Sequence, residues 1–272
     1  MRLISICPSN TELLEFLGLT DQLVGVDDYS DWPEAVSRLP RLGPDLDIDM
    51  DQVEALKPDL VIASLSVPGM EKNVEELQKR GLPYIVTNPQ SLAEIGQSLV
   101  EVGAACGVDE KARLVAERYF SQLEKFKQAA SRIENRPSLY WEWWPKPVFT
   151  PGKVNWLTEI SELAGGYNVF FNEETANFQT DWEEVKRRNP DYILLSWVGV
   201  RTEKINPAIV QKRPGWTELP AIQQQKVAVM EEELYCRPSP RLLAGLHKLA
   251  MMLHPVIFET VEMDDLFVDK SK

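Results

Sequence analysis

The chain has 272 residues, and 44% of them are apolar, which is enough to bury a core in one large domain or in two lobes of about 130 residues each. Its formal net charge of −13 disfavours a nucleic-acid partner, because proteins that bind phosphate backbones gather Lys and Arg on a basic face. The three cysteines, Cys7, Cys106 and Cys236, form no CxxC pair, so we expect buried free thiols and neither a disulfide framework nor a zinc ribbon.

Short apolar runs alternate with helical patterns in the first part of the chain. The predicted strands span residues 3–6, 23–26, 60–63 and 84–86, and the predicted helices span residues 11–17, 50–56, 70–79 and 92–106. Strands that alternate with helices are typical of parallel βαβ units. The pattern therefore predicts an α/β lobe over residues 1–108.

A long amphipathic helix is predicted over residues 109–136, where apolar side chains recur at steps of three and four until Pro137 ends the pattern. Strand and helix signals then resume over residues 138–143, 156–164, 182–188, 192–196 and 227–230, and a final helix is predicted over residues 241–252. The expected fold class is α/β, with two Rossmann-like lobes built on parallel-rich sheets. The second lobe spans residues 137–272, and the long helix joins it to the first.

The two halves share a local pattern. Residues 49–62 align with residues 181–194 without a gap. In both segments an acidic N-cap begins a short helix, and a Pro-Asp pair then connects that helix to an apolar strand. A common type of helix-to-strand connection would give the same pattern. The ungapped register, with Asp51 and Glu183 one turn inside the two helices, favours two related lobes.

The sequence contains no GxGxxG, Walker A, GxSxG or HExxH motif, which lowers the expectation of an enzyme without excluding one, and we predict no catalytic residues. The alternating acids at positions 45, 47, 49 and 51 lack the Gly and the Glu that a calcium loop requires, and helix capping explains them more simply. His247 and His254 are two helical turns apart, roughly 10 Å, which is too far for a shared ion. We predict no metal site.

Aromatic residues are concentrated in the second half. Trp141, Trp143 and Trp144 occur within four residues, and in a strand the first two face one side and Trp144 the other. Such rings suit either a core or a broad planar ligand. Ser9 and Asn10 follow the first strand, where open α/β sheets bind ligands, although ordinary helix capping accounts for them too.

Six segments resemble the cobalamin-binding members of the helical-backbone, or class III, family of ABC-importer substrate-binding proteins. They are SICPSNTE (5–12), VGVDDYSDWP (24–33), ALKPDLVIA (55–63), FTPGK (149–153), AGGYNVF (164–170) and RPSPR (237–241). The resemblance implies two α/β lobes bridged by one rigid helix and a shallow cleft that holds a corrinoid between aromatic side chains. It also implies reversible transport of cobalamin, with no covalently bound cofactor.

The resemblance also implies a set of ligand-binding residues. Tyr29 and Phe149 fall on aromatic positions of the family, Phe178 falls near another, Glu233 stands where a relative has an aspartate, and Arg237 matches an arginine. Ser64 replaces an aromatic residue, and a second one is missing around residues 42–46. The residues expected to compensate by stacking are Trp32, Trp141, Trp143 and Trp197.

The family docks on a permease dimer, which carries ATPase subunits, through one acid from each lobe. Asp51 and Glu183 fall on those positions, although acids are favoured in the first turn of any helix. By resemblance we expect a monomer that is periplasmic or membrane-anchored. Met1 and Arg2 lead into an apolar strand without a signal peptide, so a full-length chain would be cytoplasmic, whereas removal of an export signal would restore the family's location.

Two alternatives remain open at this stage. The same fold binds haem or a ferric siderophore in other proteins, although catecholate siderophores prefer basic clefts and the matched residues here are aromatic and acidic. A cytoplasmic corrinoid-handling protein or enzyme on the same scaffold would account for the missing export signal.

Overall fold

The chain forms two compact units in a computed structural model that describes residues 1–269. Unit 1 comprises Met1–Phe120 together with Pro238–Pro240, and unit 2 comprises Ser121–Arg237 and the described chain from Arg241 onward. The chain therefore passes between the units three times. The first passage lies within helix α5 (Asp109–Ala130), so this helix contributes residues to both units.

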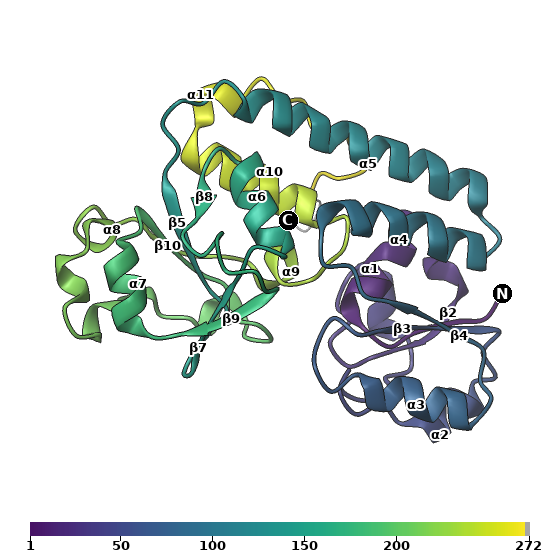
Figure 1. The fold of residues 1–272 in the computed structure, drawn as a ribbon. Coiled ribbons are helices and arrows are strands. Elements are labelled where there is room, and N and C mark those ends of the chain that lie inside the picture. The colour runs from purple at the N-terminus through teal and green to yellow at the C-terminus, as the bar shows by residue number, and fades with distance from the viewer. Residues whose placement is uncertain (270–272) are drawn as a thin grey trace. The chain divides into compact units, whose positions relative to one another are not determined.

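Unit 1 is a four-stranded parallel sheet with helices on both faces. Its strands are β1 (Leu3–Ser5), β2 (Leu23–Val26), β3 (Leu60–Ser64) and β4 (Tyr84–Thr87), in the order β2-β1-β3-β4. Its helices are α1 (Pro8–Phe16), α2 (Met50–Ala55), α3 (Glu71–Lys79) and α4 (Leu92–Ala105). Helices α1 and α4 cover one face of the sheet, and α2 and α3 cover the other (Figure 1). The predicted α/β class is confirmed here.

Unit 2 contains a second four-stranded parallel sheet. Its strands are β5 (Ser138–Glu142), β8 (Tyr167–Asn168), β10 (Tyr192–Leu195) and β11 (Val227–Val229), in the order β11-β10-β5-β8. The helices of this unit are α6 (Trp156–Leu163), α7 (Trp182–Arg188), α8 (Pro220–Gln223), α9 (Glu232–Tyr235), α10 (Leu242–Leu253) and α11 (Pro255–Phe258). Tyr140 packs toward Val185 of α7, whereas its neighbour Trp141 packs toward Ser161 of α6, so the two faces carry different helices.

The repeat predicted from residues 49–62 and 181–194 extends to the backbone. Lys57 and Asn189 occupy equivalent positions, and both are left-handed, with φ of 48° and 49°. Two residues later, Asp59 accepts a hydrogen bond from the backbone N–H of Arg2 at 2.6 Å, and Asp191 accepts one from that of Ser138 at 2.8 Å. The sheet orders also correspond when β5, β8, β10 and β11 are placed on β1, β2, β3 and β4. The two units are therefore built on one plan.

Several features differ from the sequence-based expectation: α1 begins at Pro8 instead of residue 11, and β8, α8, α9 and α11 were not predicted. Two further differences are larger. Helix α5 ends at Ala130 instead of residue 136, because the chain turns there and the guanidinium of Arg136 donates to the Ala130 carbonyl at 2.9 Å. Unit 2 also contains an unpredicted antiparallel sheet of β6 (Trp144–Pro145), β7 (Val148–Pro151) and β9 (Asn177–Thr180). These strands have two to four residues, too few to show a period.

Within residues 1–269, no helix combines the length and the apolar character that a membrane span requires.

The left-handed conformation of Lys57 predicts a stabilising substitution. Replacing Lys57 with Gly should raise the free energy of unfolding by about 0.5–1 kcal/mol, because a side chain with a Cβ is strained at positive φ and glycine is not. Urea unfolding measures this. Lys57→Ala is the control that keeps the Cβ, and equal stability of the Gly and Ala variants would contradict the expectation.

Candidate functional site

In unit 1, Tyr29 lies on a loop that is fixed by hydrogen bonds to a buried acid. Asp27 is fully buried, and its carboxylate accepts hydrogen bonds from the Tyr29 backbone N–H at 2.8 Å and from the Ser30 hydroxyl. Arg41 donates to the carbonyls of Asp27 and Ser30 at 2.9 and 2.6 Å. The Tyr29 side chain itself is 53% exposed. A rigid loop thus presents an aromatic ring to solvent just beyond β2.

The polar residues predicted at the first loop stabilise the sheet from inside. Asn10 is 1% exposed; its amide donates to the Ala63 carbonyl at 2.9 Å and accepts from the Thr87 hydroxyl at 2.7 Å. Ser9 and Ser64 are 4% and 3% exposed. Ser9 contacts the Cys7 thiol at 3.3 Å, and burial raises the pKa of that thiol to about 11. The hydrogen bonds of Asn10 thus connect the segment after β1 to the carboxyl ends of β3 and β4.

Trp32 is the remaining predicted ligand residue of unit 1. It is half-buried, and its ring lies 5.7 Å from that of Phe16 on α1, centroid to centroid. Part of the indole therefore packs on the first helix, close in sequence to the exposed Tyr29.

In unit 2, the β6-β7-β9 sheet separates two predicted ligand residues. Phe149 on β7 lies opposite Gln179 on β9, and Phe178 lies opposite Thr150, so the two phenylalanines face opposite sides of the sheet. Phe178 packs on Phe170, with ring centroids 5.6 Å apart, and belongs to the side that covers the core. Phe149 is half-buried on the other side.

The tryptophans predicted to stack on a ligand are placed differently from one another. Trp141 is fully buried and donates to Ser161 at 2.9 Å, which makes it a core residue in this structure. Trp143 is 9% exposed and lies against Trp156, with ring centroids 5.7 Å apart. Trp197 is half-buried just beyond β10 and donates to Glu142 at 3.1 Å.

Sequence reasoning missed the buried ion pair of Glu142 and Arg213. Two guanidinium nitrogens of Arg213 donate to Glu142 at 2.6 and 2.7 Å, and both side chains are almost completely buried. The Arg213 guanidinium also lies 4.4 Å from the ring centroid of Trp216 and 5.0 Å from that of Trp182. An acid between Trp141 and Trp143 in a buried strand was the available signal, since such an acid requires a buried partner.

The ion pair organises its neighbours as well. The Tyr140 hydroxyl donates to Glu142 at 2.9 Å, and burial, followed by the nearby carboxylate, raises the pKa of Tyr140 well above its usual value. With the Trp197 indole, Glu142 accepts four hydrogen bonds in all. The carboxylate is thus fully satisfied without water.

Arg237 and Glu233 lie near the end of α9. Arg237 is paired with Glu232, its Nε and one terminal nitrogen each 3.0 Å from the same carboxylate oxygen. Glu233, the predicted ligand acid, is half-exposed one position further along. The positive charge of Arg237 is therefore compensated inside unit 2.

The predicted docking acids lie in the first turns of α2 and α7. Asp49 caps α2 by accepting from the backbone N–H groups of Asp51 and Gln52, and a further hydrogen bond from the Gln52 side chain lowers the pKa of Asp49 most. Asp51 is 86% exposed and lies 2.6 Å from an Arg80 nitrogen. Glu183 is exposed at the equivalent position of α7, which Asp181 caps.

Among residues 1–269, neither the cysteines nor the histidines belong to a metal-binding cluster. Cys7, Cys106 and Cys236 carry free thiols, of which the first two are buried. Across the described residues, no group of three or more His, Cys, Asp or Glu side chains is arranged to hold a metal ion.

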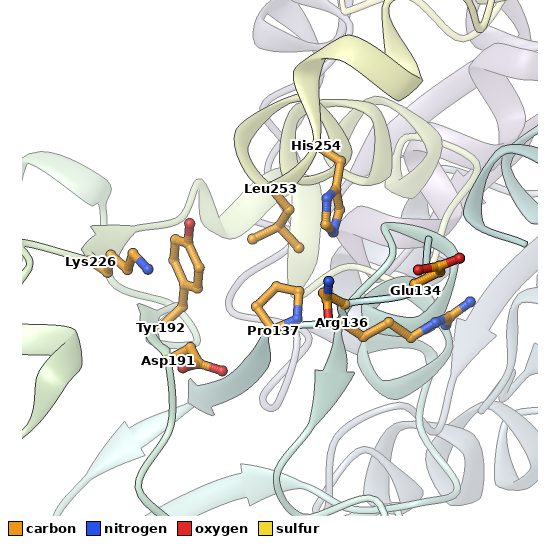
Figure 2. Close-up of a pocket in the computed structure, with 9 residues that line it drawn as sticks. Glu134, Arg136, Pro137, Asp191, Tyr192, Lys226, Leu253 and His254 are labelled. Atoms are coloured by element: carbon orange, nitrogen blue, oxygen red, sulfur yellow. The ribbon is translucent and has the colours of Figure 1, made fainter. Parts of the chain in front are cut away.

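A hollow of about 450 Å³ lies at the amino ends of β5, β10 and β11 in unit 2 (Figure 2). The rings of Tyr192 and Pro137 and the side chain of Leu253 border it, and Lys226 Nζ lies 5.1 Å from the Tyr192 ring centroid. Because Glu142 and Trp197 lie at the other ends of the same strands, the hollow contains none of the predicted ligand residues.

Comparison with known proteins gives a consistent result for the family. A family model described as periplasmic binding protein matches residues 3–234. An uncharacterized ABC transporter substrate-binding lipoprotein of Bacillus subtilis is 30% identical over 268 residues, covering 95% of this chain and 81% of that protein. The vitamin B12-binding protein of Yersinia pestis is 26% identical over 252 residues, covering 93% and 86%.

Solved structures with the same fold include proteins named for different ligands. The periplasmic vitamin B12 binding protein of Vibrio cholerae is 25% identical, with a TM-score of 0.75 over 97% of this chain and 98% of that one. A periplasmic haem-binding protein of Pseudomonas aeruginosa is 21% identical, with a TM-score of 0.81 over 94% and 93%. The second likeness concerns the fold alone.

The buried ion pair leads to a stability prediction. Arg213→Ala should destabilise unit 2 by about 3–5 kcal/mol, because it leaves the Glu142 carboxylate buried and unpaired. The double variant Glu142→Leu with Arg213→Met should lose much less, since no charge remains buried. Guanidinium unfolding followed by tryptophan fluorescence compares them, and a loss below about 1 kcal/mol for the single variant would contradict the role of the pair.

Proposed function

The chain belongs to the periplasmic binding protein family, and we propose that the small ligand it delivers to an ABC importer is cobalamin or a related corrinoid. It is an ABC-importer substrate-binding protein of the class whose members take vitamin B12, haem or iron complexes. The family is extracytoplasmic, and its members are solute-binding proteins and not enzymes.

The observation that carries the proposal is the placement of an available aromatic ring in each unit beside the parallel sheet. Tyr29 is 53% exposed on its rigid loop, and Phe149 lies on the side of the β6-β7-β9 sheet away from the core. Rings held in place lose little entropy on binding and suit a broad, nearly planar macrocycle. A corrin is such a macrocycle.

Charge supports a corrinoid over haem or a ferric siderophore. Haem carries carboxylates and ferric catecholates are anionic, whereas the rim of a corrin carries neutral amides. The net charge of −13 disfavours anionic ligands at long range. Close to the predicted site, Arg237 is neutralised by Glu232, and Arg41 is engaged by backbone carbonyls. These basic groups are thus already committed within their own units.

Titration with cyanocobalamin tests the proposed ligand. We expect saturable one-to-one binding with a Kd below about 10 µM, and about a tenfold weaker Kd for Tyr29→Ala, because the stacked ring is lost. Tyr29→Phe keeps the ring and should bind nearly as well as the wild type. Calorimetry measures both variants, and binding of hemin or a ferric catecholate without binding of cyanocobalamin would refute the corrinoid proposal.

For the permease, we propose that Asp51 and Glu183 are the two docking acids. Both are exposed, and the repeat places them at equivalent positions of α2 and α7. A two-fold permease would present equivalent basic groups to such a pair. Arg80, which is paired with Asp51, would compete only weakly with the permease for this carboxylate, since exposed ion pairs contribute only about 0–1 kcal/mol.

Docking can be measured with the importer's permease and ATPase subunits reconstituted in lipid nanodiscs. Asp51→Ala and Glu183→Ala should each weaken association about tenfold, and the double variant further, because each removes a charge-assisted hydrogen bond. Glu110→Ala, an exposed acid in the first turn of α5, is the matched control. Undiminished association of the double variant would exclude docking through these acids.

A further inference from the structure

The β6-β7-β9 sheet of unit 2 has one face that covers the core and one that does not. Val148, Thr150 and Phe178 belong to the first face: the valine and the threonine are buried, and the phenylalanine packs against the core cluster. Phe149 belongs to the other face. Its cross-strand partners are Trp144 on β6 and Gln179 on β9, and both are exposed. We call Trp144, Phe149 and Gln179 the outer row.

Trp144 is unusual among the tryptophans of this chain. It is 42% exposed, whereas the other seven, all within the described residues, are buried or half-buried. Its indole N–H donates to the Lys146 carbonyl at 3.1 Å, which fixes the ring on the β6-β7 hairpin. A ligand that covered this exposed, ordered ring would remove apolar surface from water, which contributes favourably to the free energy of binding.

Directly opposed residues of adjacent strands project from the same face with their Cβ atoms about 4.5–5.5 Å apart. Trp144 and Phe149 therefore project side by side from one face of the sheet, and a ligand that covers both rings would bury more aromatic surface than either ring offers alone. Gln179 continues the row on β9 with an amide, which both donates and accepts hydrogen bonds and carries no charge.

From this arrangement we infer that Trp144 and Gln179 contact the bound ligand together with Phe149, and this inference rests on the proposed function. The two rings stack on the face of the macrocycle, and the Gln179 amide pairs with a neutral amide on its rim. A carboxylate rim would use only the donor half of the Gln179 amide, so the outer row favours a corrinoid over haem. Neither residue belongs to the motifs of the family resemblance.

Calorimetric titration with cyanocobalamin and with hemin tests the inference. Trp144→Ala should weaken cyanocobalamin binding about tenfold, Trp144→Phe much less, and Gln179→Ala a few-fold. Tyr167→Ala is the matched control, because Tyr167 is also an exposed aromatic residue of unit 2 but pairs with Ser138 at the amino end of β5. This control should bind within about twofold of the wild type. Circular dichroism verifies that each variant is folded.

The possible outcomes separate the inference from the function. Wild-type affinity of the folded Trp144→Ala variant for cyanocobalamin would overturn the inference and leave the corrinoid function intact. Hemin binding by the wild type without cyanocobalamin binding would overturn the corrinoid function, and loss of hemin affinity in Trp144→Ala would then still support the aromatic contact. Absence of binding to either ligand by the wild type would overturn both.

Discussion

The buried contact between Glu142 and Arg213 is the interaction on which the rest of unit 2 depends. Two charges removed from water are tolerated when they are paired and hydrogen-bonded, and four donors reach the Glu142 carboxylate. Both terminal nitrogens of Arg213 donate to it, while the buried Arg213 Nε has no partner among the described residues. Because Glu142 ends β5 and the Arg213 guanidinium lies 5.0 and 4.4 Å from the ring centroids of Trp182 and Trp216, the pair ties the segment after β10 and the start of α7 to the sheet. Both the half-buried Trp197 and the helix that bears Glu183 are positioned by it.

Unit 1 uses a buried acid in a similar place. Asp27 follows β2 directly and fixes the Tyr29 loop through a backbone N–H and the Ser30 hydroxyl, which in turn contacts the hydroxyl of Thr11 at 2.7 Å. In each unit a buried carboxylate at the carboxyl end of a strand thus orders a segment that carries an accessible or half-buried aromatic ring. Binding then orders few additional groups, so less of the interaction free energy is lost to conformational entropy.

The sequence was most informative where a regular period repeats over many residues. Seven of the eight parallel strands lie within one or two residues of their predicted bounds, as do helices α2, α3, α4, α6, α7 and α10, whereas the two-residue strand β8 was not predicted. The acidic caps and Pro-Asp turns revealed the shared plan of the units. The short strands around Trp144 and Phe149 have no detectable period, so the face on which Phe178 lies could not be predicted. Asn10 was predicted as a ligand group from its position after β1, but its amide is occupied by β3 and β4. Nothing in the sequence around Arg213 indicated that it pairs with Glu142, because the two residues are 71 positions apart and no local pattern links them.

The repeat is preserved unevenly, and the proposed function accounts for the difference. The capping acids, the left-handed residues at 57 and 189 and the acids Asp51 and Glu183 correspond one to one. The segments beside the predicted ligand do not correspond, since unit 1 presents a loop and unit 2 an antiparallel sheet. A two-fold permease requires equivalent groups from both units, because its two halves are alike. An asymmetric ligand makes no such demand, because its two faces differ, so the segments proposed to contact it are free to diverge while the proposed docking acids stay alike.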